Sequence, residues 1–313
     1  MNILITGGCG YVGTMLTNQL LEKNHNVTVV DVQWFGNYLK EHKNLDIIKC
    51  DIRNIQNLNL KGIDIVIHLA NIANDPAVEL DPNLSWEVNC LATQQLIDIA
   101  VRENVNQFLF ASSGSVYGIK EEENVTEDLS LVPISTYNKT KMIAERIILS
   151  YKDKIKTHII RPATVCGYSP RMRLDVSVNM LTMQALTKKK ITVFGGSQIR
   201  PNIHILDMID VYDHFINNPE LENGFYNAGF ENVSILEIAQ KIKNKIPCDI
   251  IVTESNDNRS YRQNSSKLEK TGFTANYGID HAIEEIIDKY RKGILSDKDE
   301  FYTIKTMKKT LNL

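Results

Sequence analysis

A tyrosine and a lysine in one short stretch can together carry acid–base chemistry. Tyr137 and Lys141 lie four residues apart within 135–141, so both fall on one face of the helix expected there. A tyrosine with a pKa of about 10 is a weak base at neutral pH, but a nearby ammonium favours the phenolate and lowers that pKa. Tyr137 can then accept a proton from a substrate hydroxyl. The same spacing also occurs in ordinary surface pairs, so the surrounding motifs must decide between the two interpretations.

A group of serines follows a strand that is expected over 106–111. Ser112, Ser113 and Ser115 stand in this turn, within the stretch Phe-Ala-Ser-Ser-Gly-Ser-Val-Tyr-Gly. Hydroxyls at the carboxyl end of a parallel strand face the crevice in which ligands bind. One of the three serines can therefore steady a reacting oxygen, while the others cap the turn.

The chain begins with a glycine pattern that is typical of phosphate binding. Gly7, Gly10 and Gly13 separate an expected strand over 2–6 from an expected helix over 11–23. Glycines let the backbone approach a pyrophosphate, and the free N–H groups at the start of the helix face its negative charge. The second strand ends at Asp31, where a carboxylate accepts hydrogen bonds from the ribose of NAD. No arginine follows directly to hold the extra phosphate of NADP, so we infer NAD.

The hydrophobic pattern alternates between strands and helices and predicts a Rossmann-type α/β fold, a doubly wound parallel sheet. Strands are predicted over 2–6, 27–31, 46–49, 63–68, 106–111 and 155–161. Helices are predicted over 11–23, 84–104 and 135–152, and then near 176–188, 207–217, 234–245 and 280–292. We expect an NAD-binding domain over 1–162. We expect a smaller, mainly substrate-binding region over 163–313, from which some segments return to the sheet.

Two features of this division stay open at the level of sequence. The second region either covers the carboxyl ends of the strands or simply completes the same domain. The Lys-rich stretch 295–313 is predicted to be a solvated helix or arm.

Composition narrows the functional classes. The chain has 313 residues and a formal net charge of −3, so no basic surface indicates nucleic acid and no charged block indicates a membrane partner. No apolar stretch approaches the ~18 residues of a membrane span. The five cysteines form no Cys-x-x-Cys pair, which disfavours a zinc site or a disulfide framework and favours a reducing cytoplasm. We expect no metal.

The order of these motifs resembles extended short-chain dehydrogenases/reductases of the nucleotide-sugar epimerase/dehydratase type. The resemblance covers nearly the whole chain. Besides the glycine loop, the serine turn and the Tyr137–Lys141 pair, it rests on Asp-Ile-Arg at 51–53, His-Leu-Ala-Asn at 68–71, Arg-Pro-Ala-Thr-Val at 161–165 and Arg-Pro-Asn-Ile-His-Ile at 200–205. It implies a homodimer that pairs the helices near 84–104 and 136–152, and a nucleotide-sugar substrate.

The resemblance also implies roles for individual residues. Ser113, Tyr137 and Lys141 would be catalytic. The cofactor would meet Gly7, Gly10, Tyr11, Val12, Gly13, Asp31, Asp51, Ile52, Leu69, Ala70, Asn89, Tyr137, Lys141, Pro162 and Val165. The substrate would meet Ser113, Asn179, Arg200, Arg259 and Phe194. His204 lies in an apolar run and is interpreted as a packed or capping histidine.

Departures from the family pattern bear on the reaction. Related dehydratases carry an Asp-Glu pair directly after the catalytic hydroxyl, where this chain has Gly114 and Ser115, and the cysteine of related 3,5-epimerases is absent from the turn. The remaining residues suit oxidation of a sugar hydroxyl. Return of the hydride to the other face gives 4-epimerisation, our main interpretation.

Two alternatives stay open. Release of the ketose would make the protein a nucleotide-sugar 4-dehydrogenase or 4-ketoreductase of an activated hexose or heptose. The run that contains Arg171 and Arg173 resembles a subgroup with such enzymes, and these arginines either contact phosphate or an unusual sugar or lie in a solvated loop. A non-catalytic dinucleotide-binding protein is the third interpretation. The Tyr137–Lys141 pair and the negative net charge count against it. The nucleotide, the sugar, the pathway and the retention of NAD stay undetermined.

Overall fold

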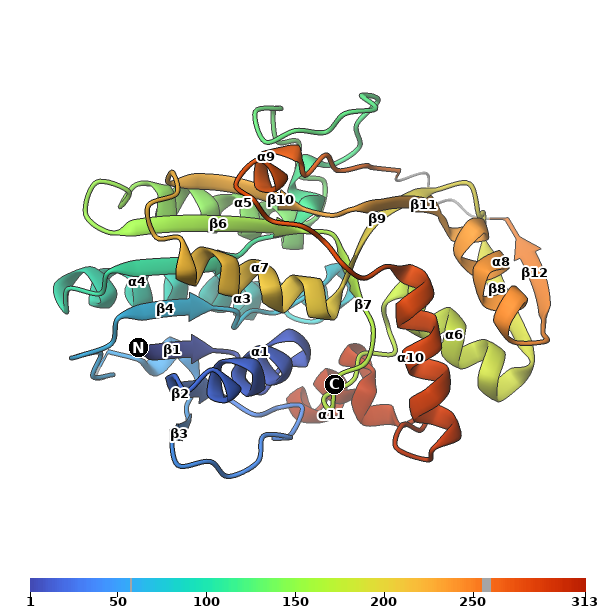
Figure 1. Ribbon diagram of the computed structural model, residues 1–313, viewed down its shortest axis with the longest axis horizontal. Helices are drawn as coiled ribbons and strands as arrows, with labels where there is room; N and C mark the ends of the chain where they lie inside the picture. Colours follow the sequence, from blue (N-terminus) through green and yellow to red (C-terminus); the bar gives the residue numbers. More distant parts are fainter. Residues whose placement is uncertain (57, 255–259) are drawn as a thin grey trace.

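The computed structural model describes residues 1–56, 58–254 and 260–313, and a seven-stranded sheet of order β10-β6-β5-β4-β1-β2-β3 dominates this part of the chain (Figure 1). Every neighbouring pair in this sheet is parallel. The strands are β1 (Asn2–Thr6), β2 (Asn26–Asp31), β3 (Leu45–Lys49), β4 (Ile65–His68), β5 (Gln107–Ala111), β6 (Lys156–Pro162) and β10 (Gly224–Ala228). The predicted Rossmann-type α/β fold is confirmed.

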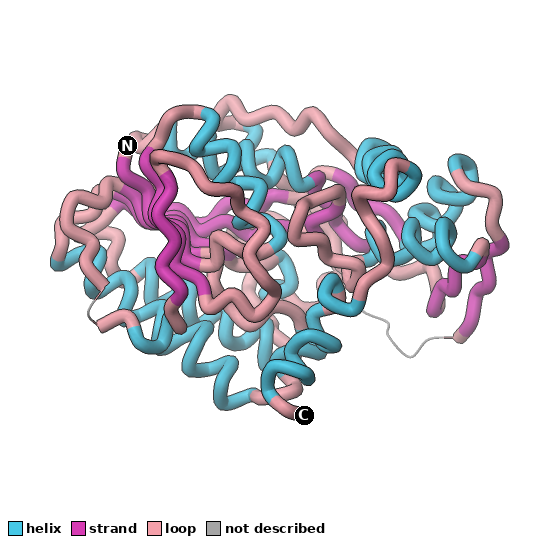
Figure 2. Tube along the Cα trace, turned by 90° about the horizontal axis from the view of Figure 1, so that it is seen from below, coloured by secondary structure: helices cyan, strands magenta, loops and turns pink. Residues whose placement is uncertain are grey.

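Helices cover both faces of this sheet, which explains why its strands are apolar without alternation (Figure 2). Ile3 and Ile5 of β1 belong to one apolar cluster, with side chains of α1 (Tyr11–Glu22) and α7 (Ile205–Asn217). Leu4, between them, belongs to the opposite cluster, with side chains of α4 (Ala92–Arg102) and α5 (Thr136–Leu149). Successive side chains of a strand point to opposite faces, so each face needs its own apolar residues.

The helix predicted over 84–104 is divided in the structure. It consists of α3 (Pro82–Trp86), a π-helical turn (η2, Glu87–Leu91) and α4. Asp81 begins α3, because its carboxylate accepts a hydrogen bond of 2.9 Å from the backbone N–H of Leu84. The π-helical turn holds Asn89, whose role in the cleft is described below. A single π-helical turn changes the spacing of apolar residues too little to be predicted from the sequence.

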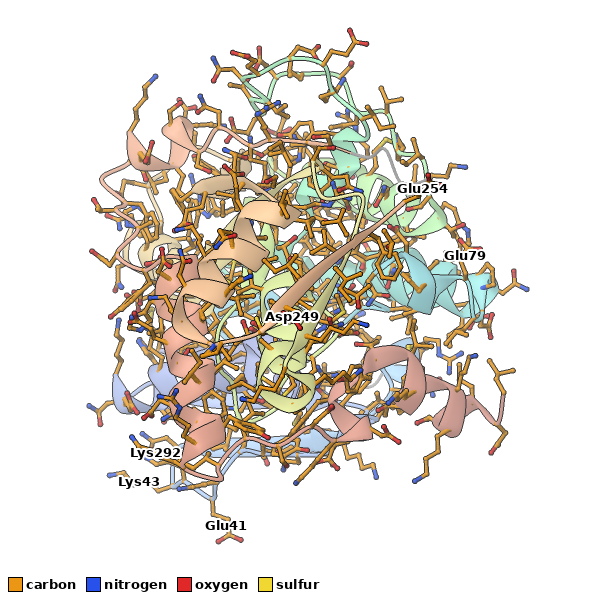
Figure 3. The ribbon with its side chains drawn as sticks, turned by 90° about the vertical axis from the view of Figure 1, so that its right-hand side faces the viewer. Glu41, Lys43, Glu79, Asp249, Glu254 and Lys292 are labelled. Carbon is orange, nitrogen blue, oxygen red and sulfur yellow. The ribbon has the colours of Figure 1, made fainter. Side chains whose placement is uncertain are left out.

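The second region builds two small sheets beside the large one (Figure 1). One contains β7 (Thr164–Cys166), β9 (Ile199–His204) and β11 (Glu231–Ser234), and the other pairs β8 (Lys190–Phe194) with β12 (Asp249–Thr253). The helices α6 (Ser177–Lys188), α8 (Ile235–Lys245) and α10 (Ile279–Arg291) share an apolar cluster with β8. β12 lies on the face turned to the viewer in Figure 3, between Asp249 and Glu254.

Some segments after residue 163 return to the large sheet. β10 extends the sheet beyond β6, and α7 packs against α1. His204 accepts a hydrogen bond of 3.2 Å from the backbone N–H of Leu206 at the start of α7, so it is a buried capping residue as expected. The boundary between 1–162 and 163–313 remains a proposal.

The helix predicted within 295–313 is present, but the prediction that this segment is solvated holds only for its outer side. This segment contains a 3-10 turn (η4, Asp299–Phe301) and the helix α11 (Thr303–Leu311). Leu295, Phe301 and Met307 are all buried, with exposed fractions of 2%, 6% and 2%. The lysines of α11 lie on its exposed side, and the apolar residues between them pack against the rest of the protein.

Candidate active site

A cavity of about 580 Å³ opens where the strands of the large sheet end. Its walls come from the loops after β1, β2, β3, β4, β5 and β6 and from the second region. The residues named from the sequence that line it are Gly7, Gly10, Tyr11, Val12, Gly13, Asp31, Asp51, Ile52, Leu69, Ala70, Ser113, Tyr137, Pro162, Val165 and Arg200. One cavity therefore brings together most of the expected cofactor and catalytic residues.

The glycine loop is shaped to leave backbone exposed to a ligand. Gly7 has a φ of +76°, and a Cβ atom there would lie 2.6 Å from the backbone nitrogen of Ala70. A Cβ atom at Gly13 would lie 2.2 Å from the carbonyl oxygen of Gly7. Helix α1 begins directly after Gly10 with no side-chain cap, so its first N–H groups are free to meet a diphosphate. This cradle fits the dinucleotide predicted from the sequence.

Asp31 stands at the end of β2 beside this loop. Its Oδ2 atom accepts a hydrogen bond of 2.9 Å from the backbone N–H of Cys9, and Oδ1 accepts one of 2.7 Å from that of Gln33. Burial raises the pKa of the carboxyl, whereas these two hydrogen bonds lower it. Each oxygen keeps a lone pair for a ribose hydroxyl, because a carboxylate offers about four acceptor sites.

The serine turn and the tyrosine meet in the same cavity. Ser113 Oγ lies 2.8 Å from Ser115 Oγ and accepts a hydrogen bond of 3.2 Å from the Ser115 backbone N–H. Ser115 in turn donates to Asn138 Oδ1 over 2.7 Å. Burial raises the pKa of Tyr137 to about 12, and a side-chain hydrogen bond with Ser113 lowers it. Ser113 is thus the serine of the turn that pairs with the tyrosine.

Lys141 lies beneath the cavity. Only 2% of it is exposed, and it does not line the cavity. Its Nζ atom donates a hydrogen bond of 2.7 Å to the carbonyl oxygen of Ala111 and stands 4.8 Å from the centre of the Phe110 ring. Burial lowers the pKa of Lys141 to about 7, against smaller opposing effects of Cys90 and Glu145.

Arg173 is a cation whose charge acts on Tyr137 in this structure, and the role expected of Lys141 stays a prediction. The charge of Arg173 lowers the pKa of Tyr137 against the larger effect of burial, whereas Lys141 is directed at a carbonyl. Arg173 donates to Asp175 Oδ1 over 3.0 Å, and both residues line the cavity. Arg171 also lines it, and its guanidinium lies 4.1 Å from the centre of the Phe35 ring. The loop of Arg171 and Arg173 therefore belongs to the site and is not simply solvated.

Two buried asparagines have structural partners. Asn89 holds the wall residue Ile72 through hydrogen bonds of 2.8 Å from its N–H and 3.2 Å to its carbonyl oxygen. Asn179 accepts from the backbone N–H of Gly167 over 3.0 Å and donates to the hydroxyl of Tyr11 and to a backbone carbonyl. Asn179 is fully buried and does not line the cavity. In this structure the side chain of Asn179 bonds to Tyr11, and its expected role at the substrate stays a prediction.

The other expected substrate residues occupy different places. Arg200 lines the cavity, and its guanidinium lies 5.2 Å from the centre of the Tyr261 ring. Phe194 ends β8 with 61% of its surface exposed and does not line the cavity. Arg259 lies outside the described residues.

A fully buried ion pair supports the serine turn from below. The guanidinium of Arg161 donates two hydrogen bonds of 2.8 Å to the carboxylate of Glu145. Glu145 also accepts a hydrogen bond of 2.6 Å from Ser112, the residue before Ser113. The arginine further donates to the hydroxyl of Tyr117 over 2.8 Å. This network joins β6, α5 and both ends of the turn.

Several residues in or beside the cavity were not predicted as site residues from the sequence. Asn138 and Asp175 lie in stretches that were noted for other residues, and Thr303, Ile304 and Met307 line the cavity from the far end of the chain. Within 1–56, 58–254 and 260–313 the structure holds no group of three or more His, Cys, Asp or Glu side chains suited to a metal ion. None of the helices in the same ranges has the length and apolar character needed to cross a membrane.

Comparisons with known proteins agree with this geometry. Residues 3–229 match the model of the NAD dependent epimerase/dehydratase family. The chain is 31% identical over 269 residues to an uncharacterised UDP-glucose epimerase of Bacillus subtilis, across 78% of this chain and 81% of that protein. It is 27% identical over 272 residues to a UDP-glucose 4-epimerase of Lactobacillus helveticus, across 77% and 82% of the two chains.

A solved structure is similar to this chain over a larger share of its length. The UDP-glucuronic acid 4-epimerase of Bacillus cereus, in complex with UDP-glucuronic acid and NAD, aligns with a TM-score of 0.82 and 27% identity. The alignment covers 93% of this chain and 99% of that chain. The glycine cradle, the placement of Asp31 and the family match together establish that the chain belongs to the NAD-dependent epimerase/dehydratase family, with NAD as its cofactor.

Proposed function

We propose that this protein epimerises carbon 4 of a UDP-sugar. The observation that carries the proposal is the pairing of Ser113 with Tyr137 in a cavity whose glycine cradle fits NAD. The named activities of the relatives, UDP-glucose epimerase and UDP-glucuronic acid 4-epimerase, support the same reaction class. Bound NAD supplies a hydride acceptor and donor for the sugar carbon.

The chain's own residues handle the proton. Tyr137 takes the proton of the 4-hydroxyl and gives it back after the sugar has turned, and Ser113 holds the same oxygen in place. Burial opposes the phenolate, so Ser113 and the positive charge of Arg173 are needed to bring the pKa of Tyr137 down. The ammonium of Lys141 bonds to the carbonyl oxygen of Ala111 below the cavity. Rotation about its flexible four-carbon side chain can bring the ammonium to a ribose hydroxyl of the cofactor.

The serine turn is poorly suited to dehydration. Loss of water needs an acid and a base at neighbouring carbons, and related dehydratases carry them at the positions of Gly114 and Ser115. A Cβ atom at Gly114 would lie 2.5 Å from the side-chain nitrogen of Gln263, so a larger residue at this position would require the end of the Gln263 side chain to shift. Ser115 already donates its proton to Asn138. We infer that the site only oxidises the sugar hydroxyl to a ketone and reduces that ketone again.

The substrate enters from the side of the second region. Arg200 is placed to bind the diphosphate of the nucleotide, since a guanidinium matches phosphate oxygens. Phe194 lies at the exposed end of β8, outside the lining of this cavity, and its role at the nucleotide base is a proposal that rests on the family resemblance alone. The uncharged Tyr261 beside Arg200 completes this side of the cavity.

Product analysis with absorbance at 340 nm tests the proposal. Purified protein is supplied with NAD and with UDP-glucose, UDP-galactose, UDP-glucuronic acid and the corresponding GDP-, CDP- and dTDP-sugars. Conversion of a UDP-sugar into its 4-epimer without net NADH supports the proposal. Steady accumulation of NADH with a keto product would instead assign a 4-dehydrogenase, and turnover of none of the UDP-sugars would contradict the proposal.

We further propose that the protein is a cytoplasmic homodimer. Leu91 of η2 is 56% exposed and Ile143 of α5 is 37% exposed, and Trp86 of the preceding helix adds apolar surface near them. Such apolar side chains on neighbouring helices are suited to burial against a second copy. All five cysteines are free, which suits a reducing compartment. Analytical ultracentrifugation at micromolar concentration that detects only monomer would refute the dimer.

A further inference from the structure

The C-terminal helix α11 is held against the cavity by residues far away in the sequence. Asp175 Oδ2 accepts a hydrogen bond of 3.1 Å from the backbone N–H of Thr303, the first residue of α11. A carboxylate at this end of a helix satisfies a free N–H group and favours the helix dipole. The backbone N–H of Leu174 donates to the carbonyl oxygen of Phe301 over 2.9 Å. Asp175 therefore acts as a cap for α11 from 128 residues away.

A second attachment connects the same segment to the loop that follows β2. The hydroxyl of Tyr38 donates to Glu300 over 3.0 Å, and the rings of Tyr38 and Phe301 are 6.4 Å apart. This loop begins directly after Asp31, the residue placed at the adenosine ribose. In Figure 1, α11 lies in the lower part of the molecule, on the side of β1, β2 and β3 and away from β6 and β10.

The inner side of α11 reaches the cavity. Thr303, Ile304 and Met307 all line it. Met307 is 2% exposed and belongs to the same apolar cluster as Ile52, and Trp34 and Phe35 pack against that cluster. Trp34, Phe35 and Ile52 line the same cavity and follow β2 and β3, where the motif of Asp51 and Ile52 is expected to meet the adenine. Lys308 and Lys309 face away from the cavity and are exposed.

We propose that α11 is part of the dinucleotide site and forms a wall against the adenosine half of NAD. Ile304 supplies apolar surface to that half, the buried Met307 anchors the helix, and Asp175 positions it. This inference rests on NAD as the cofactor of the family and does not depend on which sugar reaction the protein catalyses. It explains why an amphipathic, Lys-rich helix at the end of the chain buries its apolar face beside the cofactor cleft.

Calorimetric titration of the unaltered protein and its variants with NAD tests whether α11 contacts the cofactor. Met307→Ala should bind NAD several-fold more weakly, because truncation of this buried side chain removes packing that holds the inner side of α11 against the cofactor cleft. ADP-ribose lacks the nicotinamide and should lose the same factor, while the affinity for UDP-glucose should stay within about twofold. Lys309→Ala, on the outer side of the same helix, is the matched control and should bind NAD like the unaltered protein.

A second variant keeps the test decisive if Met307→Ala folds poorly. Ile304 is only half-buried, so Ile304→Glu is tolerated by the fold and places a negative charge beside an anionic ligand. It should weaken NAD and ADP-ribose about tenfold or more, whereas Thr310→Glu adds the same charge on the exposed side and should not. Unchanged NAD affinity in a folded Ile304→Glu would overturn the proposal. Loss of UDP-glucose affinity with unchanged ADP-ribose affinity would overturn it as well.

Discussion

Ser115 donates its hydroxyl proton to Oδ1 of Asn138 over 2.7 Å and thereby joins the turn after β5 to the first turn of helix α5. The same Ser115 lies 2.8 Å from Ser113, so one short chain of hydrogen bonds connects the two sides of the reaction centre. Asn138 is the neighbour of Tyr137, and its side chain is almost fully buried. Ser115 and Asn138, which are not themselves expected to react, therefore connect the serine turn to the helical turn that carries Tyr137.

Removal of the Ser115 hydroxyl should slow turnover without weakening binding. Ser115→Ala leaves Ser113 without one partner, so its hydroxyl is less well oriented toward the substrate oxygen. We expect kcat to fall about tenfold and KM to change less than about threefold, because only the reacting geometry is disturbed. Ser115→Thr retains a hydroxyl and should recover most of the rate. Equal rates for the unaltered protein and Ser115→Ala would show that this chain of hydrogen bonds has no role.

Tyr137→Phe should abolish the reaction while leaving the cofactor site intact. The substitution removes the group that moves the proton, and general acid–base catalysis contributes about 10²–10⁴-fold. Tyr151→Phe, which removes an exposed hydroxyl bonded to Asp98 at the end of the same helix, is the control. Steady-state rates and NAD titrations check both variants. Substantial activity in Tyr137→Phe would reject the assignment of this tyrosine.

Lys141 should make stability depend on pH above neutrality. Its pKa falls from 10.5 to about 7 on folding, because burial disfavours the ammonium. Between these two values the unfolded chain binds more protons, so the free energy of unfolding should rise with pH from about 7 to about 10. Below pH 7 Lys141 is protonated in both the folded and the unfolded chain, so the buried ammonium lowers the free energy of unfolding by its full amount.

Lys141→Met isolates this effect, since methionine fills a similar volume without a charge. The difference in unfolding free energy between the unaltered protein and Lys141→Met should shift by a few kcal/mol in favour of the unaltered protein as pH rises from 7 to 10. Urea unfolding at several pH values measures it. A difference that does not vary with pH would mean that the lysine titrates normally in the folded protein.

The ion pair beneath the serine turn should be important for stability. Glu145→Ala leaves Arg161 as a buried charge without its partner and should lower the free energy of unfolding by about 3–5 kcal/mol. The exposed pair of Lys292 and Asp288 provides a comparison, and Asp288→Ala should cost less than about 1 kcal/mol. Similar losses in the two variants, measured by urea unfolding, would contradict the role given to the buried pair.

Local patterns in the sequence determined the framework of this protein. The strand, glycine loop and helix over 2–23 predict a phosphate cradle because each part depends on its immediate neighbours, and the structure forms it there. The same holds for Asp31 at the end of β2 and for Tyr137 at the start of α5. The helix over 84–104 was predicted less well, since a π-helical turn does not change the apolar spacing enough to be seen.

Tertiary structure alone decided which distant residues complete the site. The sequence led us to expect Asn179 at the substrate and Lys141 beside Tyr137, and both roles stay predictions. Only packing could show that Asn179 also bonds to Tyr11 and that Lys141 bonds to the carbonyl oxygen of Ala111. The segment 295–313 carries many lysines and resembles a solvated arm, yet Asp175 caps its helix beside the cavity. These contacts join residues far apart in the chain, in loops and helix ends that have no periodicity. Their position follows from how the buried faces pack, and no local pattern encodes it.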